Sequence, residues 1–170
     1  MSRRVVREAV QQWISTAQIT TLNQTFTSFP KRIDFQVNSF PGQNSRAAAV
    51  VFIENESESR IAIGGVAPMA EGGKGYGWKR VDYSIALQIF HHSLQRNAEN
   101  AMDDFDILID AVKQRLREGQ HTLGVENPNL IWQAAEPSID VQYGEPLTND
   151  GGATETWAAI RFIVTEMIEQ

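Results

Sequence analysis

Four aspartates crowd one short stretch of the chain: Asp103, Asp104, Asp106 and Asp110. On a helix, Asp103 shares a face with Asp106 or Asp110, as the carboxylates of a metal site do. The stretch contains no histidine and no calcium-loop glycine pattern, so a solvated acidic face beside an apolar stripe explains these residues more simply. We therefore expect no metal here.

The three histidines offer a second kind of chemistry. His91 and His92 end a strand-like stretch, where neighbouring side chains point to opposite faces and cannot ligate one ion. His121 stands alone after a helix stop. We expect all three at the surface or at strand ends. A small α+β hydrolase using Asp103 or His91 remains a remote alternative, since no G-x-S-x-G elbow supports Ser-His-Asp catalysis.

A glycine-rich tract, Gly64 to Gly77, holds six of the twelve glycines of the chain. Lys74 invites comparison with a phosphate-binding P-loop, but Pro68 stands where that motif needs a glycine and Gly75 where it needs Ser or Thr. The dinucleotide fingerprint also fails, because no helix follows. We expect no cofactor, and interpret the tract as an extended arm for a neighbouring subunit.

Aromatic and basic residues supply the candidates for partner contact. Tyr76 and Trp78 fit interface anchoring and local packing equally well, and base stacking less well because few basic residues lie between them. The basic start of the first helix suits an acidic partner, although a solvated helix start is the simpler interpretation. The candidate residues are Gly72, Gly73, Lys74, Gly75, Tyr76, Trp78, Arg3, Arg4 and Arg7.

Composition narrows the function classes. The chain has no cysteine, which excludes disulfides, thiolate zinc sites and cysteine nucleophiles. The net charge of −6 argues against nonspecific nucleic-acid binding by the main body. No apolar run approaches the roughly 20 residues that cross a bilayer, and the N-terminus lacks a signal-peptide core. We expect one domain, residues 1–170, without membrane contact and made in a cytoplasm.

Hydrophobic periodicity predicts the elements that position these residues. A first helix begins after Ser2, and a long helix is capped by Asn97 and stopped at Gly119. Residues 19–40 are expected to be irregular, with an extended piece at 33–37. The expected strands are 47–53 and 60–63, joined as a hairpin by a turn at 54–59, then 81–89, 130–135, 139–143 and 154–168. The predicted fold class is α+β: a mostly antiparallel sheet packed against a long α-helix, with an N-terminal helix and a long Gly-rich loop.

The run VDYSIALQIFHHSLQRNAENAMDDFDILIDAVKQRLREGQHTLG, a strand and then a helix ending in Leu-Arg and Thr-Leu-Gly, resembles the small neck and tail-completion proteins of long-tailed bacteriophages. The segments 131–136 and 138–143 and a closing strand through Trp157, Phe162 and Val164 resemble the C-terminal sheet of phage tail terminators. The similarity covers residues 81–168.

This resemblance implies a structural virion protein of the tail neck, assembled in the host cytoplasm. The family forms a hexameric ring that caps the head-proximal end of the tail tube, stops tube polymerisation and docks to the head-tail connector. DNA passes through the ring without specific binding, and no catalytic residue, metal or cofactor is implied. The segment 1–40 departs from the shortest such proteins, so a head-tail connector or stopper, acting in head completion, is the alternative.

Overall fold

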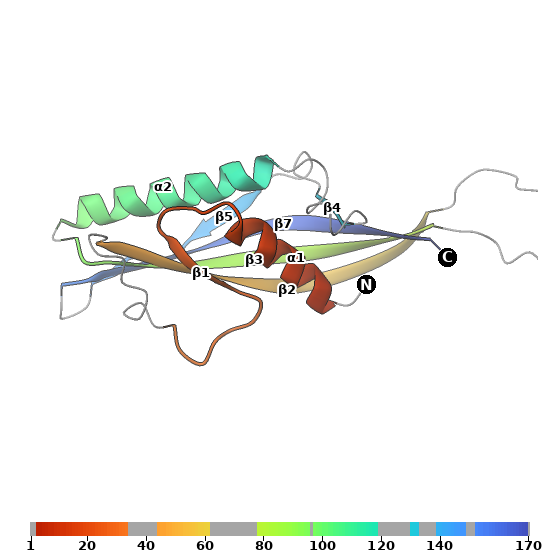
Figure 1. Ribbon diagram of the computed structural model, residues 1–170, viewed down its shortest axis with the longest axis horizontal. Helices are drawn as coiled ribbons and strands as arrows, with labels where there is room; N and C mark the ends of the chain where they lie inside the picture. Colours follow the sequence, from red (N-terminus) through yellow and green to blue (C-terminus); the bar gives the residue numbers. More distant parts are fainter. Residues whose placement is uncertain are drawn as a thin grey trace, which may run out of the picture.

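The computed structural model describes residues 3–33, 44–61, 78–95, 97–118, 130–132, 139–148 and 152–169 (Figure 1). Two helices and seven strands occur in these ranges. In chain order they are α1 (Arg3–Ser15), β1 (Leu22–Phe26), β2 (Ser45–Ile61), β3 (Trp78–Ser93), α2 (Ala98–Arg117), β4 (Leu130–Trp132), β5 (Asp140–Tyr143), β6 (Leu147–Thr148) and β7 (Thr154–Glu169).

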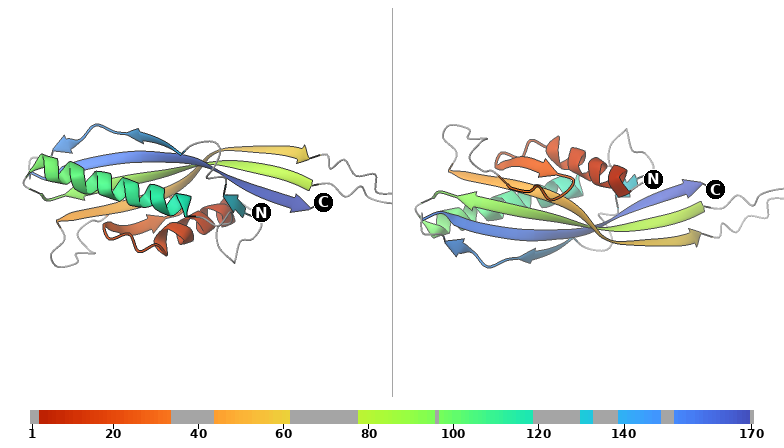
Figure 2. Two further views of the ribbon diagram at one scale, coloured as in Figure 1. Left: turned by 90° about the horizontal axis from the view of Figure 1, so that it is seen from above. Right: turned by 90° about the horizontal axis from the view of Figure 1, so that it is seen from below.

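The described strands form one sheet in the order β1-β2-β3-β7-β4, with β5 and β6 also paired to β7. β1 runs parallel to β2, and the other pairs are antiparallel. β3 and β7 pair along their whole length, from Trp78 opposite Glu169 to Ser93 opposite Thr154. The frame of the molecule is therefore a long ribbon of three strands: β2, β3 and β7 (Figure 2).

The predicted fold class, a sheet packed against one long helix, is wrong because strands dominate the structure. The three central strands have 17, 16 and 16 residues, and the described helices have 13 and 20. At about 3.3 Å per strand residue and about 1.5 Å per helix residue, each central strand spans about 50 Å and α2 only about 30 Å. Helical periodicity is easily recognised in a sequence, so the prediction overweighted the helix.

The hydrophobic core lies between one face of this ribbon and the two helices. Alternate residues of β3 are buried there, including Tyr83, Ile85, Leu87 and Ile89. They belong to one cluster with apolar residues of both helices; the helical members are Val6, Ala9, Val10, Ile14, Phe105, Leu108, Ile109, Val112 and Leu116. Seen from above, α2 lies in front of the strands, and from below it lies behind them (Figure 2). We call the face beneath the helices the core face and the opposite one the back face.

The predicted hairpin at residues 47–63 is also wrong. β2 is one continuous strand, and the polar stretch 54–59 is an exposed part of it rather than a turn. The register with β3 shifts between Ile53 and Asn55, as at a β-bulge. The ends of the strands run on past the helices (Figure 1). Side chains that are all exposed need no apolar alternation, which is why this part of β2 resembled a turn.

Local signals predicted other elements correctly. α1 and the strands within 81–89 and 154–168 are confirmed. Asn97 caps α2: its side-chain oxygen accepts a hydrogen bond from the Glu99 backbone N–H at 3.0 Å. β1 lies in the stretch predicted as irregular. Ser2, Gly119 and residues 34–37 lie outside the described residues.

Candidate interaction surfaces

The partner-contact candidates of the glycine-rich tract fall outside the described residues: Gly72, Gly73, Lys74, Gly75 and Tyr76. Their neighbours in the chain place the ends of this connection. Ile61, the last residue of β2, pairs with Trp78, the first residue of β3. The connection therefore joins two adjacent strands at the far end of the ribbon, beyond the helices (Figure 1).

The three candidate arginines of α1 do not form a common basic surface. Arg3 Nε lies 2.6 Å from a carboxylate oxygen of Glu56 in β2. Arg4 Nε donates to Glu8 Oε1, one helical turn later, at 2.7 Å. Arg7 is half-buried, and its Nε is buried without a hydrogen-bond partner in the described part of the chain. Two of the three positive charges are thus matched within the chain, and the pair of Arg3 with Glu56 joins α1 to the sheet.

The ribbon beyond the bulge is a polar structure, which we call the limb (residues 54–61, 78–84 and 164–169). The single Nε–H of Arg161, which precedes the limb in β7, is shared between the two carboxylate oxygens of Glu54 at 3.1 and 3.2 Å, and Glu58 lies 2.6 Å from Lys79 Nζ. On its core face, the Tyr83 hydroxyl donates to the buried carboxylate of Glu166 at 2.9 Å. Burial, followed by this hydrogen bond, raises the pKa of Tyr83. The limb is therefore held together by cross-strand polar contacts.

The back face of the sheet carries an aromatic cluster that the sequence did not predict. Phe52 and Phe90 alternate with core residues along their strands and so point away from the helices. The segment after β1 brings Phe29 onto them, with ring centroids 4.5 Å from Phe52 and 6.3 Å from Phe90. Phe29 is still 55% exposed. The only sequence signal was the presence of large aromatics at non-core positions of alternating strands.

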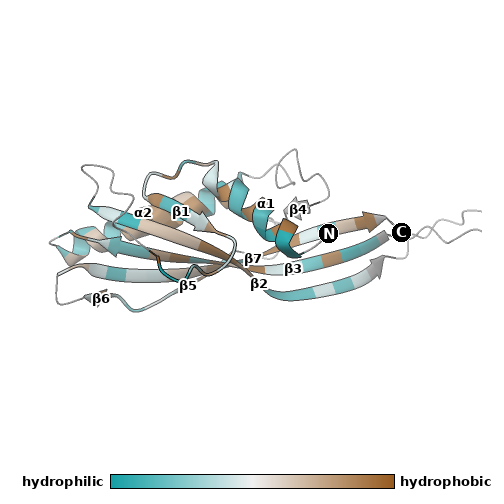
Figure 3. Ribbon diagram, turned by 60° about the horizontal axis from the view of Figure 1, so that its bottom comes forward, coloured by the Kyte–Doolittle hydropathy of each residue, from teal (hydrophilic) through white to brown (hydrophobic). Residues whose placement is uncertain are grey.

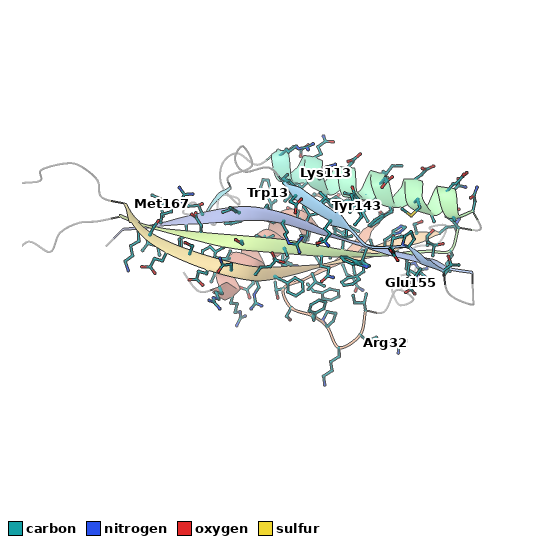
Figure 4. All side chains as sticks on the ribbon, turned by 180° about the vertical axis from the view of Figure 1, so that it is seen from behind. Trp13, Arg32, Lys113, Tyr143, Glu155 and Met167 are labelled. Carbon is teal, nitrogen blue, oxygen red and sulfur yellow. The ribbon has the colours of Figure 1, made fainter. Side chains whose placement is uncertain are left out.

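Two exposed basic residues, Lys31 and Arg32, follow Phe29 in the same segment. Figure 4 shows Arg32 projecting on the side of the sheet opposite α2 and its Lys113. We call Phe29, Lys31 and Arg32, with Phe52 and Phe90 beneath them, the Phe29 surface. Coloured by hydropathy, the sheet mixes hydrophobic and hydrophilic positions on the side turned toward the viewer (Figure 3). An exposed aromatic ring beside two cations is a combination typical of protein-binding surfaces.

The aspartates of α2 divide into buried-facing and solvent-facing groups. Asp104 accepts a hydrogen bond from Ser45 Oγ at 2.5 Å and another from Gln95 Nε2 at 3.3 Å, and so ties α2 to the end of β2. Asp103 and Asp106 are exposed, and Asp110 pairs with Lys113 at 2.7 Å. In the described part of the chain, no cluster of three His, Cys, Asp or Glu side chains could hold a metal ion.

His91 lies near the end of β3, in keeping with the predicted strand-end position, but its side chain is part of the core. Rather than lying at the surface, it is 2% exposed, stacks on Phe105 of α2 at 5.3 Å, and its Nδ1 lies 3.2 Å from Thr156 Oγ1. Burial lowers the pKa of His91 from 6.5 to about 4, against an opposing effect of Asp104 and with a smaller contribution from His92. The imidazole is therefore neutral at physiological pH. His92 lies on the opposite face, as expected, and His121 lies outside the described residues.

The geometry of these residues does not match a Ser-His-Asp triad. In a triad, histidine stands between the serine and the carboxylate, whereas here Ser45 donates directly to Asp104. Ser45 is only 5% exposed, and Asp103, the acid named for the hydrolase alternative, points to solvent. This arrangement suits a clamp between α2 and the sheet.

A cavity of about 300 Å³ lies between residues 17–20 and the last turns of α2. Arg115 lines this cavity. Its guanidinium donates to the Trp13 backbone oxygen at 3.1 Å and to Thr16 Oγ1 at 3.2 Å, and stacks over the Trp13 ring. Trp13 Nε1 donates in return to the Arg115 backbone oxygen. Arg115 thus fastens α1 to α2, and its donors are directed at the protein.

Neither a protein-family model nor a curated protein matches this sequence. Neither of the two described helices is long and apolar enough to cross a membrane.

Proposed function

We propose that this protein is a tail terminator of a long-tailed bacteriophage, a ring-forming structural protein that ends growth of the tail tube and docks to the head-tail connector. The proposal starts from the resemblance of residues 81–168 to that family. In the structure these residues include β3, α2 and β7, which share the hydrophobic core, and β3 and β7 are paired from end to end.

The limb is the observation that carries the proposal furthest. Three strands extend beyond the helices, and residues 54–59 of β2 are all exposed. Val81, Tyr83 and Val164 of the limb are buried, but the β2 edge buries little within its own chain, so a contact with another subunit would give this edge a function. Its carboxylates are matched by cations, which keeps the strand edge from unspecific pairing while leaving its outer surface for a specific partner.

In this mechanism, the end of tube growth requires binding but no catalysed reaction. A ring that binds the last layer of tube subunits occupies the surface to which the next layer would add, and the binding free energy of the ring opposes further growth. An acidic chain with a net charge of −6 also allows DNA to pass without sticking.

The test is light scattering of the purified protein with and without polymerising tail-tube protein. We expect a hexamer, or a monomer that assembles on tube ends, and tubes that stop growing when the protein is added. A protein that leaves tube growth unchanged but binds the connector would transfer the proposal to the stopper role. A protein indifferent to both would reject it.

A further inference from the structure

Two exposed surfaces on opposite sides of the molecule have complementary chemistry. The Phe29 surface lies on the back face, with an aromatic ring beside Lys31 and Arg32. On the helix side, the outward stripe of α2 carries Ile107, which is 68% exposed. Acidic residues surround this isoleucine. They are Glu99, Asp103, Asp106 and Asp110, all exposed.

Helical spacing makes these residues one surface. Asp103 lies four residues before Ile107, and Asp110 lies three after it, so all three share a face of α2. We call this set, with Glu99 and Asp106, the Ile107 stripe. An apolar residue enclosed by charges has the anatomy of a small interface, with an anchor and a polar rim.

The charges on the two surfaces are available to a partner. No hydrogen bond or ion pair within the described residues holds the side chains of Asp103, Asp106, Lys31 or Arg32. Each surface thus offers one exposed apolar anchor and at least two unmatched charges, negative on the Ile107 stripe and positive on the Phe29 surface.

We propose that the Phe29 surface of one subunit binds the Ile107 stripe of a second copy of this chain. The two surfaces lie on opposite sides of the sheet, so the contact is heterologous: each subunit uses one surface toward each neighbour. Repetition of such a contact produces a closed ring or an open filament. This inference rests on the proposed function in that it assigns the subunit contact of the ring.

Two single substitutions test the contact in the full-length protein. Phe29→Ser removes one anchor and Ile107→Ser removes the other, and both positions are more than half exposed, so the fold should survive. Leu147→Ser is the matched control, because Leu147 is 65% exposed but belongs to neither surface. Circular dichroism verifies folding, and sedimentation velocity measures association at low salt, where exposed charges act most strongly.

We expect the wild type and Leu147→Ser to associate in a manner that salt weakens, and each anchor variant to associate at least tenfold more weakly. An equimolar mixture of the two anchor variants should stop at a one-to-one dimer, because each retains one competent surface. Association of either anchor variant at the wild-type level would overturn the inference, as would a mixture that forms nothing larger than a monomer.

The outcomes separate this inference from the proposed function. A ring that forms equally well in both anchor variants and still stops tube growth would leave the terminator function in place and reject the assigned contact. A wild type that remains monomeric at every concentration would likewise reject the contact, while the tube-growth experiment would decide the function independently.

Discussion

His91 lies near the end of β3, as expected, but its side chain is buried rather than at the surface. Its imidazole is buried between β3, Thr156 and the Phe105 ring, and its Nε2 has no hydrogen-bond partner among the described residues. Asp104 of α2 and the neighbouring His92 are the charged or titratable groups that act on its pKa. A neutral ring suits this site, because a buried imidazolium would lose its hydration without gaining a partner.

This burial predicts a loss of stability in weak acid. Folding lowers the pKa of His91 from 6.5 to about 4. Below about pH 6.5 the imidazole is therefore protonated in the unfolded chain but stays neutral in the folded chain. The free energy of unfolding is therefore unaffected by protonation of this histidine above pH 6.5, and it decreases as the pH falls toward 4, by at most about 3 kcal/mol. Urea unfolding of the wild type and of His91→Gln across this range measures the difference in slope.

His92→Gln is the control for the His91 experiment, since His92 lies on the back face. The wild type and His92→Gln should lose stability more steeply between pH 6.5 and 4 than His91→Gln does. Equal slopes in all three proteins would mean that His91 titrates normally in the folded state, and the burial argument would then be wrong.

At the scale of elements, α2 is fixed to the sheet by one face only. Phe105 is 1% exposed and contacts His91 and Tyr143, whereas Ile107, two residues later, is 68% exposed. Phe105→Ala should lower the free energy of unfolding by roughly 3 to 5 kcal/mol through lost burial and the cavity left behind. Ile107→Ala should leave it within about 0.5 kcal/mol, as exposed substitutions usually do.

Chemical denaturation of the two variants and the wild type measures this contrast. A small effect of Phe105→Ala would show that α2 contributes little to the fold. A large effect of Ile107→Ala in the isolated subunit would show that the outward stripe is buried there, which would also remove the basis for the subunit contact.

The alternation of apolar and polar residues in β3 shows how much of the fold could be predicted from the sequence. Apolar residues at every second position from Val81 predicted one buried face, and the same phase, continued to position 91, would have placed His91 in the core. The prediction failed where composition was taken as a guide to burial. Polar residues 54–59 were interpreted as a turn, although β2 continues through them, paired with β3 and with their side chains exposed.

The Phe29 surface had a weaker signal in the sequence because it depends on contacts between distant segments. Parallel pairing of β1 with β2 directs the following segment across the back face, where Phe29 meets Phe52 and Phe90. Single-sequence periodicity describes one element at a time and gives no information on which strands become neighbours. The basic and aromatic residues were visible, but their common location was not.

At the scale of the whole molecule, the proposed function places assembly in a different region from most of the hydrophobic core. The helices and most of the core occupy one part of the ribbon, and the limb, which shares Val81, Tyr83 and Val164 with the core, extends to the paired residues Ile61 and Trp78. The residues between these two, which lie outside the described part, connect strand ends that β-sheet pairing already holds together. Changes in that connection should therefore affect the neighbours of the subunit more than its core.

Deletion of residues 66–75 tests this separation. We expect the shortened protein to fold, with a change in the free energy of unfolding of about 1 kcal/mol or less, because loop-closure entropy depends weakly on length. Its ability to stop growth of tail tubes should fall strongly, since the proposed arm to the neighbour is lost. A variant with the same ten positions replaced by Gly and Ser separates length from side chains: recovery of activity would assign the role to length, and continued loss would assign it to Lys74 and its neighbours. Unfolding of the deleted protein would instead show that the tract supports the limb itself.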